Sequence, residues 1–207
     1  MQRLLDRGEL YFNHPRLYNE WQAQEPQSGD IFEGADWVEN AYVKKIQFLH
    51  PTLGTGELIP DPRELSKQIQ YNYDFLSYSM YALTTDEFVG KDTFSIDPGN
   101  ADLKDADSAI FIQEPYLFLK AVTAEIKSRN LRYRAKHVQY KDISTEGLTK
   151  MNPFIKKKEH QHQNEFRIIL ENMDDKPQAI SIGSIATYSY LVSAKSMIET
   201  VWKVPGK

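Results

Sequence analysis

Proline and glycine divide this chain of 207 residues into short apolar segments, and this division most limits the folds open to it. Pro51–Pro62 holds three prolines and two glycines, and Gln22–Asp36 is polar with one proline and two glycines. Both stretches predict loops, because proline removes a backbone donor and glycine favours turn conformations. The apolar runs between the loops are short, so the sequence predicts strands mixed with short helices.

Pro115–Arg129 has the pattern of the one longer helix, with Leu119, Val122 and Ile126 at helical spacing and Pro115 in the first turn. Further helices are expected over Arg16–Trp21, Arg63–Tyr71 and Ala194–Val201. The expected strands are Glu9–Phe12, Ala41–Phe48, Phe75–Leu83, Ile110–Ile112, Leu131–Lys141, Phe166–Leu170, Ala179–Ile182 and Tyr188–Val192. Because strands and helices do not alternate regularly, we predict a single α+β domain over residues 1–207, with short helices on a mixed or mainly antiparallel sheet.

Composition removes several classes of chemistry. The chain has no Cys, which excludes disulfides, Cys-ligated zinc, iron–sulfur clusters and a cysteine nucleophile. The sequence contains no P-loop, G-x-G-x-x-G or G-x-S-x-G motif. The segment Met1–Tyr11 is interrupted by charges, and no apolar run approaches the length of a bilayer span. We therefore expect a cytoplasmic protein without membrane contact.

The densest polar segment is Lys156–Arg167, KKKEHQHQNEFR, which leads into the apolar strand Phe166–Leu170. Side chains alternate along a strand, so an extended segment would place Gln163, Glu165 and Arg167 on one face. The sequence thus predicts an amide, a carboxylate and a guanidinium in a row at the start of a central strand.

The Gln163-x-Glu165 spacing is similar to the catalytic pattern of mono-ADP-ribosyltransferases. On that resemblance Glu165 would stabilise the charge that develops as nicotinamide leaves NAD, and Gln163 would position the acceptor. Arg167 or Arg134 would bind phosphate, Lys156 would line the cleft, and Tyr78 would stack on nicotinamide.

Two other chemistries remain open at the same segment. His160 and His162 could share a strand face and bind a divalent ion with Glu159 or Glu165, although we expect a polar turn and no metal. Glu165-Phe166-Arg167 also has the shape of a nuclease element, with Asp74 or Glu33 as the upstream acid. Arginine, however, is a poor substitute for the lysine that usually ends that element.

Positive charge gathers in two places along the second half of the chain, around Arg129–Lys141 and at Lys156–Lys158. With interleaved tyrosines this charge could bind a phosphate-bearing ligand. The net charge is −4, however, so a nucleic-acid partner is not expected.

Several segments together resemble a widespread family of uncharacterised bacterial and phage proteins that is known only as a domain of unknown function. The resemblance covers Glu9 to about Leu191, and Phe154–Leu170 is its most specific part. The matching residues are Phe154, Lys156, Glu165, Phe166, Arg167 and the turns Tyr18-Asn19-Glu20 and Phe32-Glu33-Gly34, with Glu20 where an Asp is usual. The resemblance implies no activity, but it marks Asn19, Glu33, Lys156, Glu165 and Arg167 as site candidates.

Three functions therefore compete. The first is an ADP-ribosyltransferase-like enzyme that binds NAD or a related nucleotide through Glu165 and Gln163. The second is a non-enzymatic phage or mobile-element protein that binds and inhibits a host defence protein. The third is a divalent-metal nuclease. The expected partner is thus a nucleotide-like small molecule or a protein target, and no oligomeric state is predicted.

Overall fold

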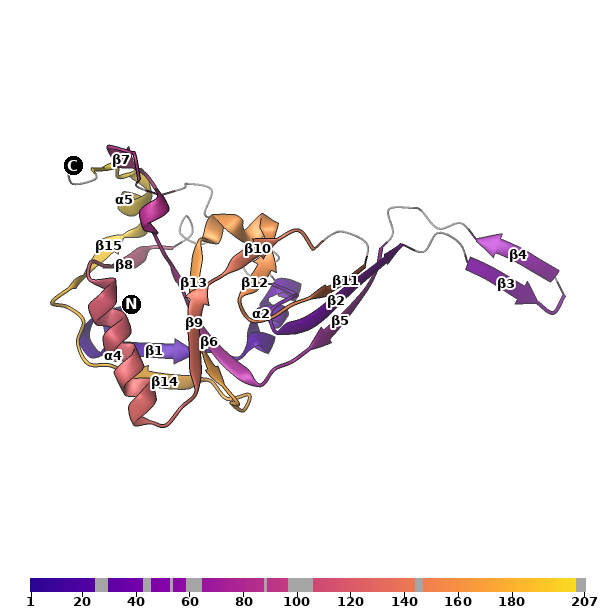
Figure 1. The fold of residues 1–207 in the computed structure, drawn as a ribbon, viewed down its shortest axis with the longest axis horizontal. Helices are drawn as coiled ribbons and strands as arrows, with labels where there is room; N and C mark the ends of the chain where they lie inside the picture. The colour runs from indigo at the N-terminus through magenta and orange to yellow at the C-terminus, as the bar shows by residue number, and fades with distance from the viewer. Residues whose placement is uncertain are drawn as a thin grey trace.

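The computed structural model describes residues 1–24, 30–42, 46–52, 54–58, 65–87, 89–96, 106–143 and 147–203. A three-stranded antiparallel sheet lies near the middle of the molecule (Figure 1). It consists of β6 (Phe75–Tyr81), β13 (Glu165–Glu171) and β9 (Tyr133–His137), with β13 in the centre. The alternation expected along Phe166–Leu170 is present, so this sheet has an apolar face and a polar face.

The apolar face of this sheet packs into the main hydrophobic core. Leu76, Ile168 and Leu170 contact α4 (Pro115–Ser128) and the antiparallel pair β1 (Glu9–Phe12) and β14 (Gln178–Ser181). Helix α4 buries Phe118, Val122 and Ile126, each at most 1% exposed. Leu119, expected in this row, is only half-buried beside them. Each fully buried apolar side chain adds about 1.5–3 kcal/mol to the free energy of unfolding. The packed core therefore fixes the sheet and the side chains on its polar face.

A second antiparallel sheet consists of β11 (Gly147–Lys150), β2 (Ala35–Tyr42) and β5 (Leu65–Tyr71). The helix expected over Arg63–Tyr71 is therefore wrong for Leu65–Tyr71, and residues 63–64 lie outside the described part. Ile69 and Tyr71, two residues apart, both pack against the core of this sheet, which is the spacing of a strand. Pairing with β2 along the whole of β5 outweighs the local helix preference.

A third sheet is a separate hairpin, here called the arm. Strands β3 (Ile46–His50) and β4 (Gly54–Leu58) pair antiparallel, with Ile46 opposite Leu58. Figure 1 shows the arm extending well away from the rest of the molecule. Pro51–Pro62 was expected to be a loop, but its Gly54–Leu58 part is a strand. The expected strand Ala41–Phe48 falls on both β2 and β3, with residues 43–45 and 59–64 outside the described part.

The remaining elements are short. They are α1 (Gln2–Arg7), α2 (Pro15–Gln24), α5 (Ala194–Glu199), the 3₁₀ turns η1 (Thr85–Glu87) and η2 (Lys158–Gln163), and strands β7 (Thr93–Phe94), β8 (Ser108–Ile112), β10 (Gln139–Lys141), β12 (Ile155–Lys157), β15 (Ser189–Ser193) and β16 (Trp202–Lys203).

Strands β10 and β12 pair in parallel, and the other strand pairs of the described residues are antiparallel. The α+β class is confirmed, although the strands form several small sheets rather than one. In the described part of the chain, no helix is both long and apolar enough to cross a membrane.

Candidate functional site

Four of the five candidates marked by the sequence meet on the polar face of the central sheet. We call Glu33, Lys156, Glu165 and Arg167 the buried charge cluster. The Arg167 guanidinium contacts both Glu33 oxygens at 2.5 and 3.0 Å, and its Nε lies 2.6 Å from Glu165 Oε1. Lys156 Nζ lies 2.8 Å from Glu165 Oε2. The side chains of Glu33, Glu165 and Arg167 are at most 5% exposed.

The fifth candidate, Asn19 on α2, holds in place the turn that carries Glu33. Its Nδ2 donates to the carbonyl oxygens of Asp30, Ile31 and Glu33 at 2.9, 3.1 and 3.1 Å. Its Oδ1 accepts a hydrogen bond from the Tyr73 hydroxyl at 3.0 Å. The two Nδ2 hydrogens are shared among the three carbonyl oxygens and Oδ1 accepts one bond, so both ends of the Asn19 amide are held in place. Asn19 is therefore a positioning residue for Glu33.

Electrostatics in the cluster follow from its burial and its matched charges, two carboxylates and two cations. Burial opposes the charge of Glu165, yet Arg167 and Lys156 outweigh burial and hold the pKa of that carboxyl well below its usual range. Burial also opposes the charge of Lys156, but Glu165 raises its pKa. Burial raises the pKa of Glu33, and Arg167 only partly offsets it. The cluster is thus a mutually neutralised unit.

Both oxygens of Glu165 are already occupied. Oε1 accepts from Arg167 and from the Ser79 hydroxyl, and Oε2 faces Lys156. The Tyr140 hydroxyl accepts the Glu165 backbone N–H at 2.8 Å, which fixes the start of β13. The three side-chain donors leave one acceptor position on Oε2, but the side chain is only 5% exposed, so a ribose hydroxyl would reach the carboxylate only if the cluster opened. The geometry therefore gives Glu165 the surroundings of a structural ion pair.

Gln163 does not stand in the strand row expected for it. It ends η2, and Asn164, with a positive φ of 39°, separates it from β13. Gln163 Oε1 instead accepts from Lys156 Nζ at 2.8 Å. The structure thus brings Gln163 to the cluster through Lys156 rather than through strand alternation.

Tyr78 and Arg134 lie elsewhere than the NAD hypothesis placed them. Tyr78 projects from the apolar face of β6, its ring 5.7 Å from that of Phe12, and burial raises its pKa to about 12. It cannot stack on a ligand at Glu165, which is on the other face. Arg134 pairs at 2.5 Å with Glu171, at the opposite end of β13 from Glu165.

Of the two candidate nuclease acids, Glu33 lies with Glu165 around Arg167, whereas Asp74 does not. The histidine pair has no third ligand gathered with it in the described residues. The rings of His160 and His162 are 6.5 Å apart, and His162 Nδ1 lies 2.9 Å from the Glu159 carbonyl. Asp74 precedes the end of β6 that pairs with Glu171, whereas Glu165 pairs with the other end. In the ranges that the structure describes, no three His, Asp or Glu side chains gather as a metal site would require.

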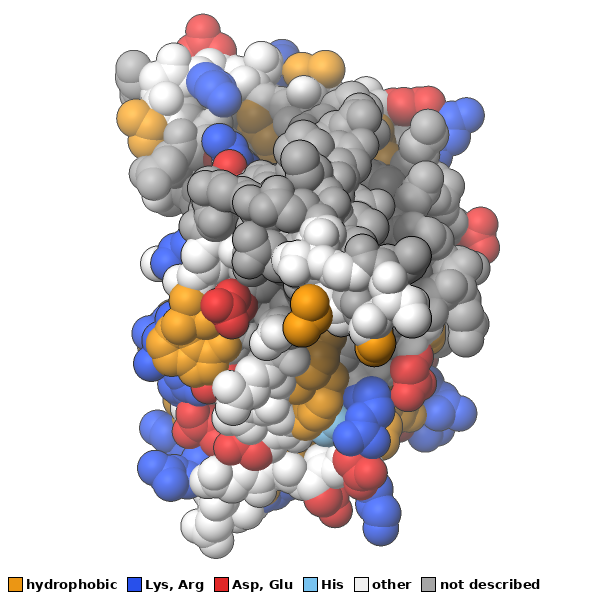
Figure 2. Space-filling model, turned by 90° about the vertical axis from the view of Figure 1, so that its right-hand side faces the viewer, with side chains coloured by type: hydrophobic (Ala, Val, Ile, Leu, Met, Phe, Trp, Pro, Cys, Tyr) orange, Lys and Arg blue, Asp and Glu red, His pale blue; other side chains and the backbone are white. Residues whose placement is uncertain are grey.

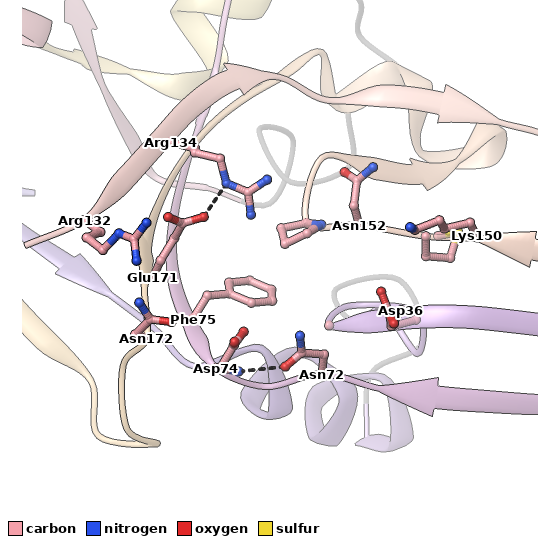
Figure 3. A pocket seen from close by; sticks show the side chains of 14 residues that line it. Asp36, Asn72, Asp74, Phe75, Arg132, Arg134, Lys150, Asn152, Glu171 and Asn172 are labelled. Atoms are coloured by element: carbon pink, nitrogen blue, oxygen red, sulfur yellow. Dashed lines mark hydrogen bonds and ion pairs between the residues drawn. The ribbon is translucent and has the colours of Figure 1, made fainter.

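A cleft of about 350 Å³ lies between the two three-stranded sheets, and we call it the inter-sheet cleft. Its walls come from the start of β2, the β5–β6 turn, β9, the segment after β11 and the end of β13 (Figure 3). It is lined by Gly34, Ala35, Asp36, Asn72, Asp74, Phe75, Arg132, Arg134, Lys150, Met151, Asn152, Pro153, Glu171 and Asn172.

This cleft touches the buried charge cluster at one wall. The Pro153 carbonyl oxygen accepts from Arg167 Nη1 at 2.6 Å, and Gly34 follows Glu33 directly. The sequence reasoning weighed Asp74, Arg132 and the acidic loop that ends at Asp36 only for other roles, and it missed Asn72 and Asn152. The signal that could have found them is their position at strand ends and turns, where a rigid sheet presents polar side chains to a ligand.

Comparison of this chain with protein-family models, with curated proteins and with solved structures finds no match. The family resemblance and the ADP-ribosyltransferase pattern therefore stay predictions from the sequence. What the protein does has to be argued from its own surface and its own site.

Proposed function

We propose that this protein acts by binding a protein target, and that the arm makes the contact. This is the second of the three functions considered from the sequence. In a phage or mobile-element setting, the target would be a host defence protein. The observation that carries the proposal is that β3 and β4 form a sheet of their own, standing away from the other elements (Figure 1).

An isolated two-stranded hairpin is at best marginally stable in water and needs a surface to pack on. The arm also exposes Leu49, which at 80% is the most exposed large apolar side chain of the described residues. An apolar side chain on a projecting hairpin is suited to insertion into a partner, and the free strand edges can pair with a partner strand. A protein target explains both features.

Two further observations support binding over chemistry. Glu165 accepts from Arg167, Lys156 and Ser79 and its side chain is only 5% exposed, so the hypothesised catalytic carboxylate is not accessible to a ligand. On the face seen from the side of the arm, described Lys and Arg side chains are interspersed with Asp and Glu (Figure 2). A mixed surface of this kind suits a protein partner better than a polyanion.

The direct test replaces Ile46–Leu58 by a short Gly-Ser linker. Since Ile46 and Leu58 are cross-strand partners, a short linker can join the ends. The tagged wild-type protein should capture a stoichiometric partner from bacterial lysate, and the linker variant should lose it. Leu49→Asp should weaken capture, whereas Leu191→Asp, an exposed strand leucine far from the arm, should not.

The same samples separate binding from NAD chemistry. Glu165→Gln should keep the captured partner, and the wild-type protein should neither transfer nor hydrolyse labelled NAD. Capture that is unchanged by loss of the arm would overturn the proposal. Turnover of NAD that disappears in Glu165→Gln would restore the enzyme hypothesis in its place.

A further inference from the structure

The inter-sheet cleft carries charges of both signs that other side chains of the described residues do not neutralise. Of its six charged side chains, Arg134 and Glu171 pair with each other at 2.5 Å. Lys150 lies over the Trp37 ring, 5.5 Å from its centre. Asp36, Asp74 and Arg132 remain, and within the described part of the chain the charged group of each has no hydrogen-bond or ion-pair partner.

These three residues are held rigidly even though their side chains are unpaired. The carbonyl oxygens of Asp36, Asp74 and Arg132 accept the backbone N–H groups of Met151, Met173 and Glu171 at 2.7, 3.0 and 2.9 Å. Each bond ties one wall of the cleft to a neighbouring segment. The backbone positions from which the three charged side chains extend are therefore fixed, with Asp36 half-buried and Asp74 and Arg132 exposed to a ligand from solvent.

Figure 3 shows how the signs are distributed. Asp36 lies on β2, Asp74 lies in the β5–β6 turn, and Arg132 lies directly before β9 on the other side. Between them lies the Phe75 ring, which is buried and gives the cleft an apolar floor. The amide side chains of Asn72, Asn152 and Asn172 add hydrogen-bonding groups around the rim.

We propose that the inter-sheet cleft binds a small dipolar molecule, a free amino acid or a dipeptide. Its carboxylate pairs with Arg132, its cationic group pairs with Asp74 and Asp36, and its aliphatic part lies on Phe75. A volume of about 350 Å³ falls at the lower end of the range of small-molecule sites. This site is separate from the arm and goes beyond the proposed function.

The balance of charges in the cleft favours a dipolar ligand over a nucleotide. Three cations and three carboxylates line the cleft, so the site has no excess of positive charge. A phosphate near Arg132 would gain one ion pair but would also meet the three carboxylates of the same cleft, Asp36, Asp74 and Glu171. A ligand with one positive and one negative group offers a partner of opposite charge to Arg132 and to the two aspartates. It places no charge next to an unpaired group of the same sign.

Isothermal titration calorimetry with the full chain tests the site. The probes are the common L-amino acids, their glycyl dipeptides, agmatine, inorganic phosphate and AMP. At least one amino acid or dipeptide should bind, and agmatine, phosphate and AMP should bind at least about tenfold more weakly than the best of them. Agmatine retains the guanidinium of arginine and lacks the carboxylate that Arg132 would bind.

Variants connect the binding to the named groups. Arg132→Gln and Asp74→Asn should each weaken the best probe at least about tenfold. The controls Arg3→Gln and Asp175→Asn remove exposed charges outside the cleft and should leave the affinity unchanged. The linker variant without the arm should also bind normally, so failure of this site and failure of the proposed function are distinguishable.

Three outcomes overturn the inference. Phosphate or AMP binding as tightly as the best amino acid would make the cleft an anion site. Equal binding of the probe to wild type and to both cleft variants would place the ligand elsewhere. No binding by any amino acid or dipeptide up to about 10 mM would leave the cleft without this function.

Discussion

At the scale of single residues, two Arg–Glu pairs on adjoining strands differ mainly in their contact with water. Arg167 on β13 contacts Glu165 at 2.6 Å with both side chains at most 5% exposed. Arg134 on β9 contacts Glu171 at 2.5 Å with side chains 46% and 27% exposed. Removing one member of a buried pair leaves an uncompensated charge in a poorly solvated place, whereas an exposed pair contributes little.

Arg167→Met should therefore lower the free energy of unfolding by about 3–5 kcal/mol, because Glu33 loses its cation partner and Glu165 keeps only Lys156. The matched change Arg134→Met should lower it by about 1 kcal/mol or less. Urea denaturation of both variants and the wild type gives the comparison. Equal stability of the two variants would mean that the buried charge cluster contributes no more to the free energy of unfolding than the exposed Arg134–Glu171 pair.

The pH dependence of stability reports on Glu165 directly. Its folded-state pKa is below the usual value of 4.5, so the stability it contributes is present above that value and is lost as pH falls. Between pH 5 and pH 3 the wild type should lose about 2 kcal/mol more than Glu165→Gln, which cannot titrate there. Urea denaturation at several pH values measures the difference. Parallel profiles would mean that the folded-state pKa of Glu165 is not lowered.

At the scale of elements, the turn between α2 and β2 decides where Glu33 lies. Gly34 has a φ of +77°, and a Cβ there would stand 2.8 Å from the Tyr73 ring. That ring stacks on Tyr71 at 5.1 Å and its hydroxyl is bonded to Asn19, so it cannot easily move. The turn and the aromatic side chains beneath it thus form one packed unit.

Gly34→Ala should lower the free energy of unfolding by about 2 kcal/mol or more, from the left-handed backbone and the clash together. Gly183→Ala is the control, because Gly183 has a φ of +80° but nothing lies within 4 Å of its added Cβ. That control should lose only about 1–2 kcal/mol. Thermal and urea unfolding of both variants separate the backbone strain, which the two share, from the clash with Tyr73, which only Gly34→Ala has. Equal losses would show that Tyr73 yields to the added methyl group.

Elements that are determined by residues within one segment were predictable from the sequence. Strand β5, which is determined by pairing with a distant strand, was not. Pro115 and the apolar spacing along α4 lie within one segment, and so does the alternation of β13. Strand β5 forms by pairing with β2, which lies about 30 residues earlier in the sequence. The side chains of Glu33 and Arg167 meet across 134 positions, so the sequence grouped them only through the family resemblance and the nuclease pattern, and no geometry could be foreseen.

At the scale of the whole molecule, a body with a large apolar core carries a hairpin that stands apart from it (Figure 1). The body and the arm should differ in the free energy needed to open their backbone hydrogen bonds. Strand β13 is central in its sheet, and Ile168, Ile169 and Leu170 are at most 2% exposed. Among the described residues the arm is a single strand pair, so each of its strands is held only by hydrogen bonds to the other.

Hydrogen exchange should show this difference in the free protein. Amides of β13 should exchange only through global unfolding, whereas arm amides should exchange through local opening at about 0–2 kcal/mol. Mass spectrometry of peptides covering Glu165–Glu171 and Ile46–Leu58 measures both. The arm peptides should become protected when the captured partner is added, while the β13 peptides stay unchanged. Strong protection of the arm in the free protein would mean that it already packs on a surface and has no need of a partner.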